Sequence, residues 1–542
     1  MRTAIYNGKI YLDRGKFAEA VLIEGDTVLK VGTTAEILAS PDLTEKIDCE
    51  GRTVIPGLND SHMHLMMIGE ALEQLSLENC KSVAELITVS KAYLAQHPEA
   101  LKKGLYGRAW NQDYFVDEKR IPNRHDLDQI STEIPVVLER VCGHILVTNT
   151  KAIEMLGLKA GSPQYKGGVF HVEEDGTPNG VFTEDACRYP LGLIQESTLE
   201  EKRMLLLKAM EYAVSRGITS VQSNDLSYYI KDHNGFIRMI HSLYEEGVAP
   251  LRYRLQACFQ SPESFAESFE NGLYSHASDL SDDYFAIGPL KLFKDGSLGA
   301  RTAMVRHPYL DDPGNPDNRG VETTDAATMD RYCEIAAKHG VQVVTHVIGD
   351  RAVGDTLDSY EKVLIDGENK YRNSLIHCQL TTLEDLKRIA RMGILVQYQP
   401  IFLNYDHQIC EARVGKELAS TSYAFRTLQD LGGKISYGTD SPVEDCNPFE
   451  NIYCAVTRKG LDGQPPEGFY PQECVDVYTA VDAYTIGSAY CEFAEDRKGR
   501  IRAGYLADMV ILDKDIFEIP VDEIKNVRPV RTIMGGKTVN RS

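Results

Sequence analysis

The stretch VIPGLNDSHMHL, residues 54–65, runs from a short apolar segment through Pro-Gly to two histidines, His62 and His64. The segment before them is typical of a buried strand. Side chains at i and i+2 of a strand point to the same side, so both imidazoles can reach one ion. Imidazole is a common ligand of zinc and similar metals. With 14 histidines in 542 residues, such a pair arises by chance in about one chain of three, so its meaning depends on the rest of the sequence.

Other polar side chains also stand at the ends of apolar runs. The runs are ITSVQS (218–223), IGPLKLF (287–293), VQVVTHVIGD (341–350), SLIHCQL (374–380), GILVQYQP (393–400) and KISYGTD (434–440). Helical stretches such as TLEEKRMLLLKAMEYAVSRG and TTLEDLKRIARMG alternate with them. Alternating strands and helices predict βα units on a parallel sheet, and about eight strands predict a (β/α)₈ barrel, a TIM barrel of class α/β.

The chain ends have a different pattern from the middle. Residues 1–55 and 490–542 contain short alternating strands with Asn-Gly and Gly-Asp turns, which predict one composite β-sandwich domain. Residues 56–489 are then the barrel domain. His346 and His377 are 31 residues apart, about one βα unit, whereas His62 and Lys291 are 229 residues apart. We therefore expect an insertion at about 70–200.

Composition excludes several classes of function. Lys and Arg total 58 against 80 Asp and Glu, a formal charge of −22, which argues against nucleic acid and anionic membranes as partners. No apolar stretch approaches the length of a membrane span, and the N-terminus lacks the apolar region of a signal peptide. Twelve scattered cysteines without a CxxC pair indicate reduced thiols. We expect a cytoplasmic protein.

The strand-end residues form a constellation of metal-ligand types. His62, His64, His346, His377 and Asp440 would converge at the mouth of the barrel, where barrel active sites are built. Lys291 stands in an apolar run of the same set. Buried near a dication, its pKa would fall, and a neutral lysine can take up CO₂ to give an anionic carbamate. Lys294, three residues on, is the rival and should face the opposite side.

These residues resemble the amidohydrolase superfamily of metal-dependent hydrolases, and more closely its branch that includes N-substituted formamide deformylase. The matching motifs are PGLNDSHMH, the run from Lys291 to Ala303, the run from His346 to Ala352, Gln399-Pro400 and the segment around Asp440. Two positions depart from the branch. Ile376-His377 replaces its Glu-His, and Cys142-Gly143-His144 replaces its Asp-Gly-His. Both departures bear on which substrate the protein accepts and leave the metal chemistry unchanged.

The resemblance implies a binuclear metal centre. His62, His64 and Asp440 would hold one ion, His346 and His377 the other, and carbamylated Lys291 would bridge them. Two zinc ions are expected, with Mn, Fe or Co as alternatives. Metal-activated hydroxide would attack an amide-type carbonyl, with Asp440 as general acid–base catalyst. The implied reaction is hydrolysis of a C–N bond in an N-acyl or N-formyl amine or a cyclic amide.

Several points stay open at this stage. Candidate substrate contacts are Trp110, His144, Arg301, Gln399 and Arg426. Trp110 could equally be a packed aromatic residue, and His144 a packed polar group. A one-metal site, with His377 contacting substrate, would suit a deaminase, although the segment after His346 offers Asp350 and no glutamate. A catalytically silent barrel acting as a binding protein is the third reading. The expected partner is a small-molecule amide, and a homodimer is the default assembly.

Overall fold

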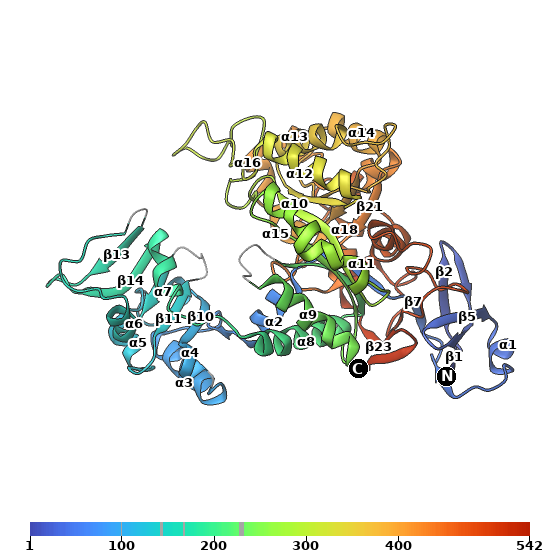
Figure 1. Cartoon of the computed structure of the whole chain (residues 1–542), viewed down its shortest axis with the longest axis horizontal. Helices are drawn as coiled ribbons and strands as arrows, with labels where there is room; N and C mark the ends of the chain where they lie inside the picture. The colour runs from blue at the N-terminus through green and yellow to red at the C-terminus, as the bar shows by residue number, and fades with distance from the viewer. Residues whose placement is uncertain (99, 141–144, 166–167, 227–231, 542) are drawn as a thin grey trace. The chain divides into compact units, whose positions relative to one another are not determined.

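The structure, a computed structural model, describes residues 1–98, 100–140, 145–165, 168–226 and 232–541 (Figure 1). The chain forms two compact units. The first comprises Met1–Gly69 and Arg203–Ser542, and the second comprises Glu70–Lys202. The second unit therefore interrupts the first in sequence.

Eight parallel strands of the first unit form one sheet, in the order β21-β20-β19-β18-β17-β16-β15-β8. Their bounds are β8 (Leu58–Met63), β15 (Ile218–Leu226), β16 (Arg252–Ala257), β17 (Phe285–Phe293), β18 (Val343–Val347), β19 (Ser374–His377), β20 (Leu395–Tyr398) and β21 (Lys434–Tyr437). The two end strands meet just past their carboxyl ends, where Asp440 N–H donates to His62 O (2.8 Å) and His64 N–H to Ser441 O (2.8 Å). The sheet is thus a nearly closed barrel, which confirms the predicted fold class.

Helices connect the strands and cover the sheet. They are α8 (Leu199–Ser215), α9 (His233–Glu245), α10 (Pro262–Asn271), α12 (Ala326–His339), α13 (Asp350–Glu361), α14 (Leu383–Met392), α16 (Cys410–Ala419), α17 (Phe425–Asp430) and α18 (Pro448–Thr457). In α14 the Thr382 side chain accepts from Asp385 N–H at the start, and Gly393 ends the helix in the left-handed conformation. Leu386, Ile389 and Met392 form its buried stripe.

The two chain ends build a pair of small sheets. One has the order β24-β23-β22-β7-β2-β3, with β24 (Lys537–Arg541), β23 (Pro529–Met534), β22 (Met509–Leu512), β7 (Thr53–Pro56), β2 (Lys9–Asp13) and β3 (Lys16–Ala18). The other has the order β5-β4-β1-β6, with β5 (Thr27–Gly32), β4 (Ala20–Glu24), β1 (Arg2–Tyr6) and β6 (Glu45–Asp48). Ile5 and Ile23 of one sheet share a core with Val54 and Met509 of the other. Strands from both ends of the chain therefore lie in one sheet (Figure 1).

The second unit has its own sheet and core. The strand order is β13-β14-β12-β11-β10-β9, with β13 (Gly168–Val172), β14 (Pro178–Glu184), β12 (Ile145–Thr148), β11 (Val136–Arg140), β10 (Leu105–Trp110) and β9 (Leu75–Ser76). Its larger helices are α3 (Val83–Gln96), α5 (Arg124–Asp128) and α6 (Thr150–Met155). Leu75, Leu86, Trp110, Leu127 and Leu138 pack together in its core.

No helix within the described residues combines the length and the apolar character needed to cross a membrane.

Candidate metal centre

His62 and His64 come from the end of β8, the strand that begins directly after Pro56-Gly57. All six residues of β8 are buried, and His62 lies on the strand while His64 follows its last residue. The backbone of both histidines is bonded to the segment after β21, as described above. Only 1% of the His62 side chain is exposed, against 17% for His64. The β8–β21 junction therefore brings the two imidazoles to the residues that follow β21.

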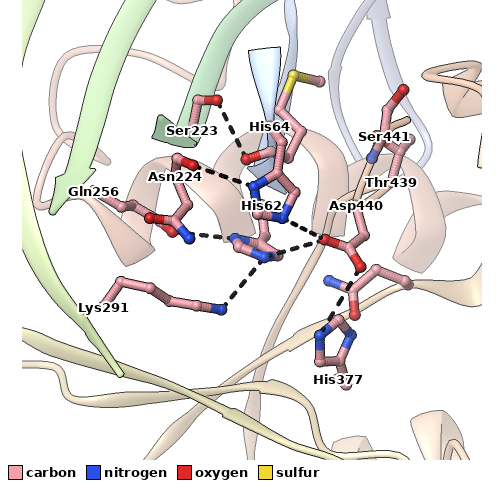
Figure 2. Close-up of polar contacts among 12 residues, drawn as sticks. His62, His64, Ser223, Asn224, Gln256, Lys291, His377, Thr439, Asp440 and Ser441 are labelled. Carbon is pink, nitrogen blue, oxygen red and sulfur yellow. Dashed lines mark hydrogen bonds and ion pairs between the residues drawn. The ribbon is translucent and has the colours of Figure 1, made fainter. Parts of the chain in front are cut away.

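Asp440 lies between these two imidazoles (Figure 2). Its Oδ1 is 3.2 Å from His62 Nε2 and 3.1 Å from His64 Nε2. One ligand atom from each of the three residues lies within 4.8 Å of the others. Asp440 has φ +57°, which is uncommon for a residue with a side chain. Such backbone strain occurs at functional sites because the surrounding structure holds it in place.

Lys291 of β17 reaches the same point from inside the barrel. Its Nζ is 3.5 Å from His62 Nε2 (Figure 2), and its side chain is buried. Burial lowers the pKa of Lys291 to about 8 and outweighs the opposing charge of Asp440. Lys294 is also buried, but its Nζ binds Glu322 Oε1 (2.6 Å) and Thr324 O (2.9 Å). The Nζ atoms of the two lysines thus have separate partners, and of the two only that of Lys291 lies beside a histidine ring.

His346 and His377 complete the group from β18 and β19. Their ring centroids are 4.5 Å apart, and the His377 ring is 5.9 Å from that of His62. His377 Nε2 lies 4.0 Å from Asp440 Oδ2. His346 Nε2–H donates to Gly296 O (3.0 Å). With the proton on Nε2, the other ring nitrogen, Nδ1, carries the lone pair. The structure thus brings all six side chains of the predicted constellation together.

Hydrogen bonds on the far side of two rings set their orientation. His64 Nδ1–H donates to the carbonyl of Asn224 (3.1 Å), and His62 Nδ1–H donates to Gln256 Oε1 (3.1 Å). With Nδ1 as the donor, each ring turns its Nε2 towards Asp440. Asn224 and Gln256, on β15 and β16, are supporting residues that sequence reasoning missed. A single amide or a backbone carbonyl has no spacing signature that could have revealed them.

The charge states favour metal-ligand chemistry. Burial, reinforced by the charge of Lys291, lowers the pKa of His62 to about 3, and burial lowers the pKa of His346 to about 4. Burial and the neighbouring His346 also hold the pKa of His377 well below its usual range. For Asp440, burial acts to raise the pKa, but His62 and His64 outweigh it and hold the pKa well below its usual value. At neutral pH these three histidines are neutral imidazoles and Asp440 is an ionised carboxylate. At His64, burial acts to lower the pKa, but the neighbouring Asp440 outweighs it and raises the pKa.

Among the six candidate ligands, two buried atoms lack a hydrogen bond within the described residues. They are His377 Nδ1 and Asp440 Oδ1, and Asp440 Oδ1 also lies at ion-pair distance from His62 Nε2 and His64 Nε2 (3.2 and 3.1 Å). A buried polar atom without a partner is costly. A divalent cation accepts lone pairs from histidine nitrogen and aspartate oxygen, so these donors fit a metal ion such as zinc.

The candidate substrate contacts lie in differing surroundings. Trp110 is fully buried in the core of the second unit, where its Nε1–H donates to Leu138 O (3.0 Å), which favours the packed-aromatic alternative. Gln399 follows β20 and is buried, with Oε1 unpartnered among the described residues. Arg301 binds Asp311 through two nitrogens (2.9 and 2.8 Å), and Arg426 pairs with Asp430 (2.8 Å). His144 lies outside the described residues.

Two phenylalanines that the sequence had not indicated flank the histidines. The Phe402 ring stacks on His377, with centroids 5.6 Å apart and planes at 15°. The Phe293 ring is centred 5.6 Å from that of His346 and 4.6 Å from Lys291 Nζ. Both rings are half-buried. They are apolar neighbours of the candidate ligands at the carboxyl ends of the strands.

Comparison with known proteins gives matches over nearly the whole chain. Residues 45–540 match the model of the amidohydrolase family. YtcJ of Bacillus subtilis (strain 168) is 31% identical over 544 residues, covering 99% of each chain. N-substituted formamide deformylase of Arthrobacter pascens is 25% identical, covering 96% of this chain and 95% of that protein. A solved structure of an uncharacterized metal-dependent hydrolase from Pyrococcus furiosus is 29% identical with a TM-score of 0.77, covering 96% of this chain and 100% of that one.

Proposed function

This chain belongs to the amidohydrolase family, and from that premise we propose that it hydrolyses the C–N bond of a small-molecule amide. The substrate class is an N-acyl or N-formyl amine or a cyclic amide. The 25% identity to N-substituted formamide deformylase over 96% of this chain supports including N-formyl amines. Family membership supports a metal-dependent hydrolase, and the proposal adds the bond and the substrate class.

The proposed centre is binuclear, with two zinc ions as the preferred metals and Mn, Fe or Co as alternatives. His62, His64 and Asp440 would hold one ion, and His346 and His377 would hold the other. Lys291, as a carbamate, would supply an oxygen donor to both. Its pKa of about 8 supports this step, because a substantial fraction of the amine is neutral near pH 8. The neutral nitrogen forms a bond to the carbon of CO₂ and releases a proton, leaving an anionic oxygen donor.

Metal ions bound here would lower the pKa of a water ligand towards 7 and polarise the substrate carbonyl. The protein supplies the proton transfers. Asp440 is ionised, and its Oδ2 is the carboxylate oxygen turned away from His62 and His64, so it can take the proton from water. Asp440 then delivers that proton to the leaving nitrogen. His64 and His346, 17% and 16% exposed, are the more accessible ligands, which favours substrate approach from their side.

One observation carries the proposal. Asp440 Oδ1 is buried between two imidazole nitrogens, 3.2 and 3.1 Å away, without a hydrogen bond among the described residues. Ligand atoms of His62, His64 and Asp440 thus converge within 4.8 Å of one another. A divalent cation satisfies all three, and a vestigial barrel would have no reason to retain them.

The test is hydrolysis of a panel of N-formyl and N-acyl amines by metal-stripped and zinc-reloaded protein. We expect turnover only after reloading. Asp440→Asn should lower kcat/KM by at least about 100-fold, the usual scale of acid–base catalysis. Asp317→Asn, at an exposed carboxylate, is the matched control.

Two results would contradict the proposal. Ammonia release from amino-heterocycles without amide hydrolysis would identify a deaminase. Full zinc loading without turnover of any substrate in either panel would identify a binding protein.

A further inference from the structure

The ligand His64 occupies an unusual position in the backbone. It is the single residue between β8, which ends at Met63, and α2 (Leu65–Glu73). The first N–H groups of a helix have no partner within the helix, and the side chain just before the helix commonly accepts from them. The imidazole of His64 points to Asp440 instead, with Nε2 3.1 Å from Oδ1. Helix α2 therefore needs its acceptors from another segment.

Strand β15 supplies those acceptors. Ser223 Oγ accepts the N–H of Leu65 (2.7 Å), and Asp225 Oδ1 accepts the N–H of Met66 (2.9 Å). The residue between them, Asn224, accepts His64 Nδ1–H through its carbonyl (3.1 Å). Figure 2 draws Ser223 and Asn224 beside His64. Three consecutive residues of one strand thus hold the ring and the following backbone of one candidate ligand.

The Asp225 carboxylate is itself held by two hydroxyl groups. Its Oδ2 accepts from Ser223 Oγ–H (2.6 Å) and from Tyr253 O–H of β16 (2.5 Å). Asp225 is 6% exposed and Tyr253 is 2% exposed. Three hydrogen bonds and the start of α2 together offset part of the cost of burying this carboxyl group. Both residues lie behind the turn, and within the described residues neither side chain hydrogen-bonds to Asp440 or to another candidate ligand.

We propose that Asp225 and Tyr253 are positioning residues that fix His64 as a metal ligand through the backbone of residues 64–66. The inference rests on the metal centre of the proposed function. Metal–ligand distances tolerate deviations of only about 0.2 Å. A turn free to shift would move Nε2 of His64 relative to Asp440, so the buried carboxylate and its tyrosine restrict that movement. Neither residue touches the reacting atoms.

The test compares zinc affinity in Tyr253→Phe, Asp225→Asn and wild-type protein, measured by competition with a chelator. Tyr11→Phe is the matched control, because Tyr11 is also buried and donates to a carboxylate, Asp482 (3.0 Å), away from the centre. We expect both test variants to bind the zinc ion held by His62, His64 and Asp440 about 10-fold less tightly, the usual effect of changing residues that support metal ligands. Tyr11→Phe should lower the thermal stability and leave zinc affinity unchanged. The visible spectrum of cobalt-loaded Tyr253→Phe should also change, since it reports ligand geometry.

Unchanged zinc affinity and an unchanged cobalt spectrum in Tyr253→Phe, with thermal stability lowered as in Tyr11→Phe, would overturn the proposal. If Asp225→Asn does not fold, Tyr253→Phe decides alone. The two proposals fail in different ways. A wild-type protein that binds no zinc overturns the metal centre and this inference with it, whereas wild-type binding with unaffected variants overturns only the positioning role.

Discussion

Glu444 is a half-buried carboxyl group among other acids. Burial raises its pKa to about 7, helped by the charges of Asp406, Glu450 and Asp445. The folded protein therefore holds a proton that the unfolded chain releases near its ordinary pKa of 4.5. The contribution of Glu444 to stability falls as pH rises between these two values and is least favourable above about 7.

Glu444→Gln removes that cost. We expect the variant to be more stable than wild type at pH 8 by about 1–2 kcal/mol, after discounting for partial exposure, and equal to it near pH 4.5. Urea unfolding at both pH values measures this difference. The exposed Glu467→Gln serves as control. An equal gain at both pH values, or no gain at pH 8, would show that the carboxyl group is not destabilised by ionisation.

At the scale of single residues, the candidate ligands could be predicted from the sequence because each one ends an apolar run or, like Lys291, lies within one. A histidine or aspartate at such a position stands out against β-branched neighbours, as His346 does in VVTHVIGD. The supporting side chains do not stand out. Gln256 and Asp225 are ordinary polar residues within strands, and their roles depend on which strands become neighbours.

The closure of the barrel depends on the contact between the end of β8 and the segment that follows β21. Asp60 Oδ2 accepts from Thr439 Oγ1–H (2.7 Å), and Asp60 Oδ1 accepts from the N–H groups of Thr439 and His62. Gly438 lies against this junction. A Cβ there would sit 2.6 Å from His62 N and 2.8 Å from Asp60 Oδ1. The glycine thus allows the close approach that puts Asp440 beside His62.

Gly438→Ala should force the two strand ends apart. We expect a loss of about 1–3 kcal/mol in unfolding free energy, typical of overpacking, together with weaker zinc binding. Gly299→Ala, where a Cβ meets no atom within 4 Å, is the control. Urea unfolding of the metal-free proteins and zinc titration measure the two effects. If Gly438→Ala matches Gly299→Ala in both, close approach at this junction does not matter.

Among the elements, the barrel strands differ in how visible they are in the sequence. Runs such as VQVVTHVIGD combine β-branched residues with a glycine turn and are easily recognised. Strand β16 reads RYRLQA, in which charged residues alternate with apolar ones and no ligand type ends the run. Its place between β15 and β17 follows from the barrel as a whole. That placement brings Gln256 to His62.

At the scale of the whole molecule, the ends of the chain and the barrel depend on each other. Arg252 begins β16 and binds Asp508, just before β22, through two nitrogens (2.7 and 2.9 Å). Both residues are buried. The strands at each chain end could be predicted from the local sequence. The Arg252–Asp508 ion pair could not, because it joins residues 256 positions apart. Likewise, the spacing of His62 and Lys291 indicated an insertion, while the six-stranded sheet in Glu70–Lys202 depends on pairings that the sequence pattern did not reveal.

The central claim is a two-ion centre bridged through Lys291, and metal content per chain tests it most directly. Elemental analysis should find about two zinc equivalents in wild-type protein, and one or fewer in Lys291→Ala, because the bridging donor is lost. Lys294→Ala, at a buried lysine bonded to Glu322, should keep the wild-type content. Equal metal content in wild type and Lys291→Ala would contradict the bridge and favour a one-metal site.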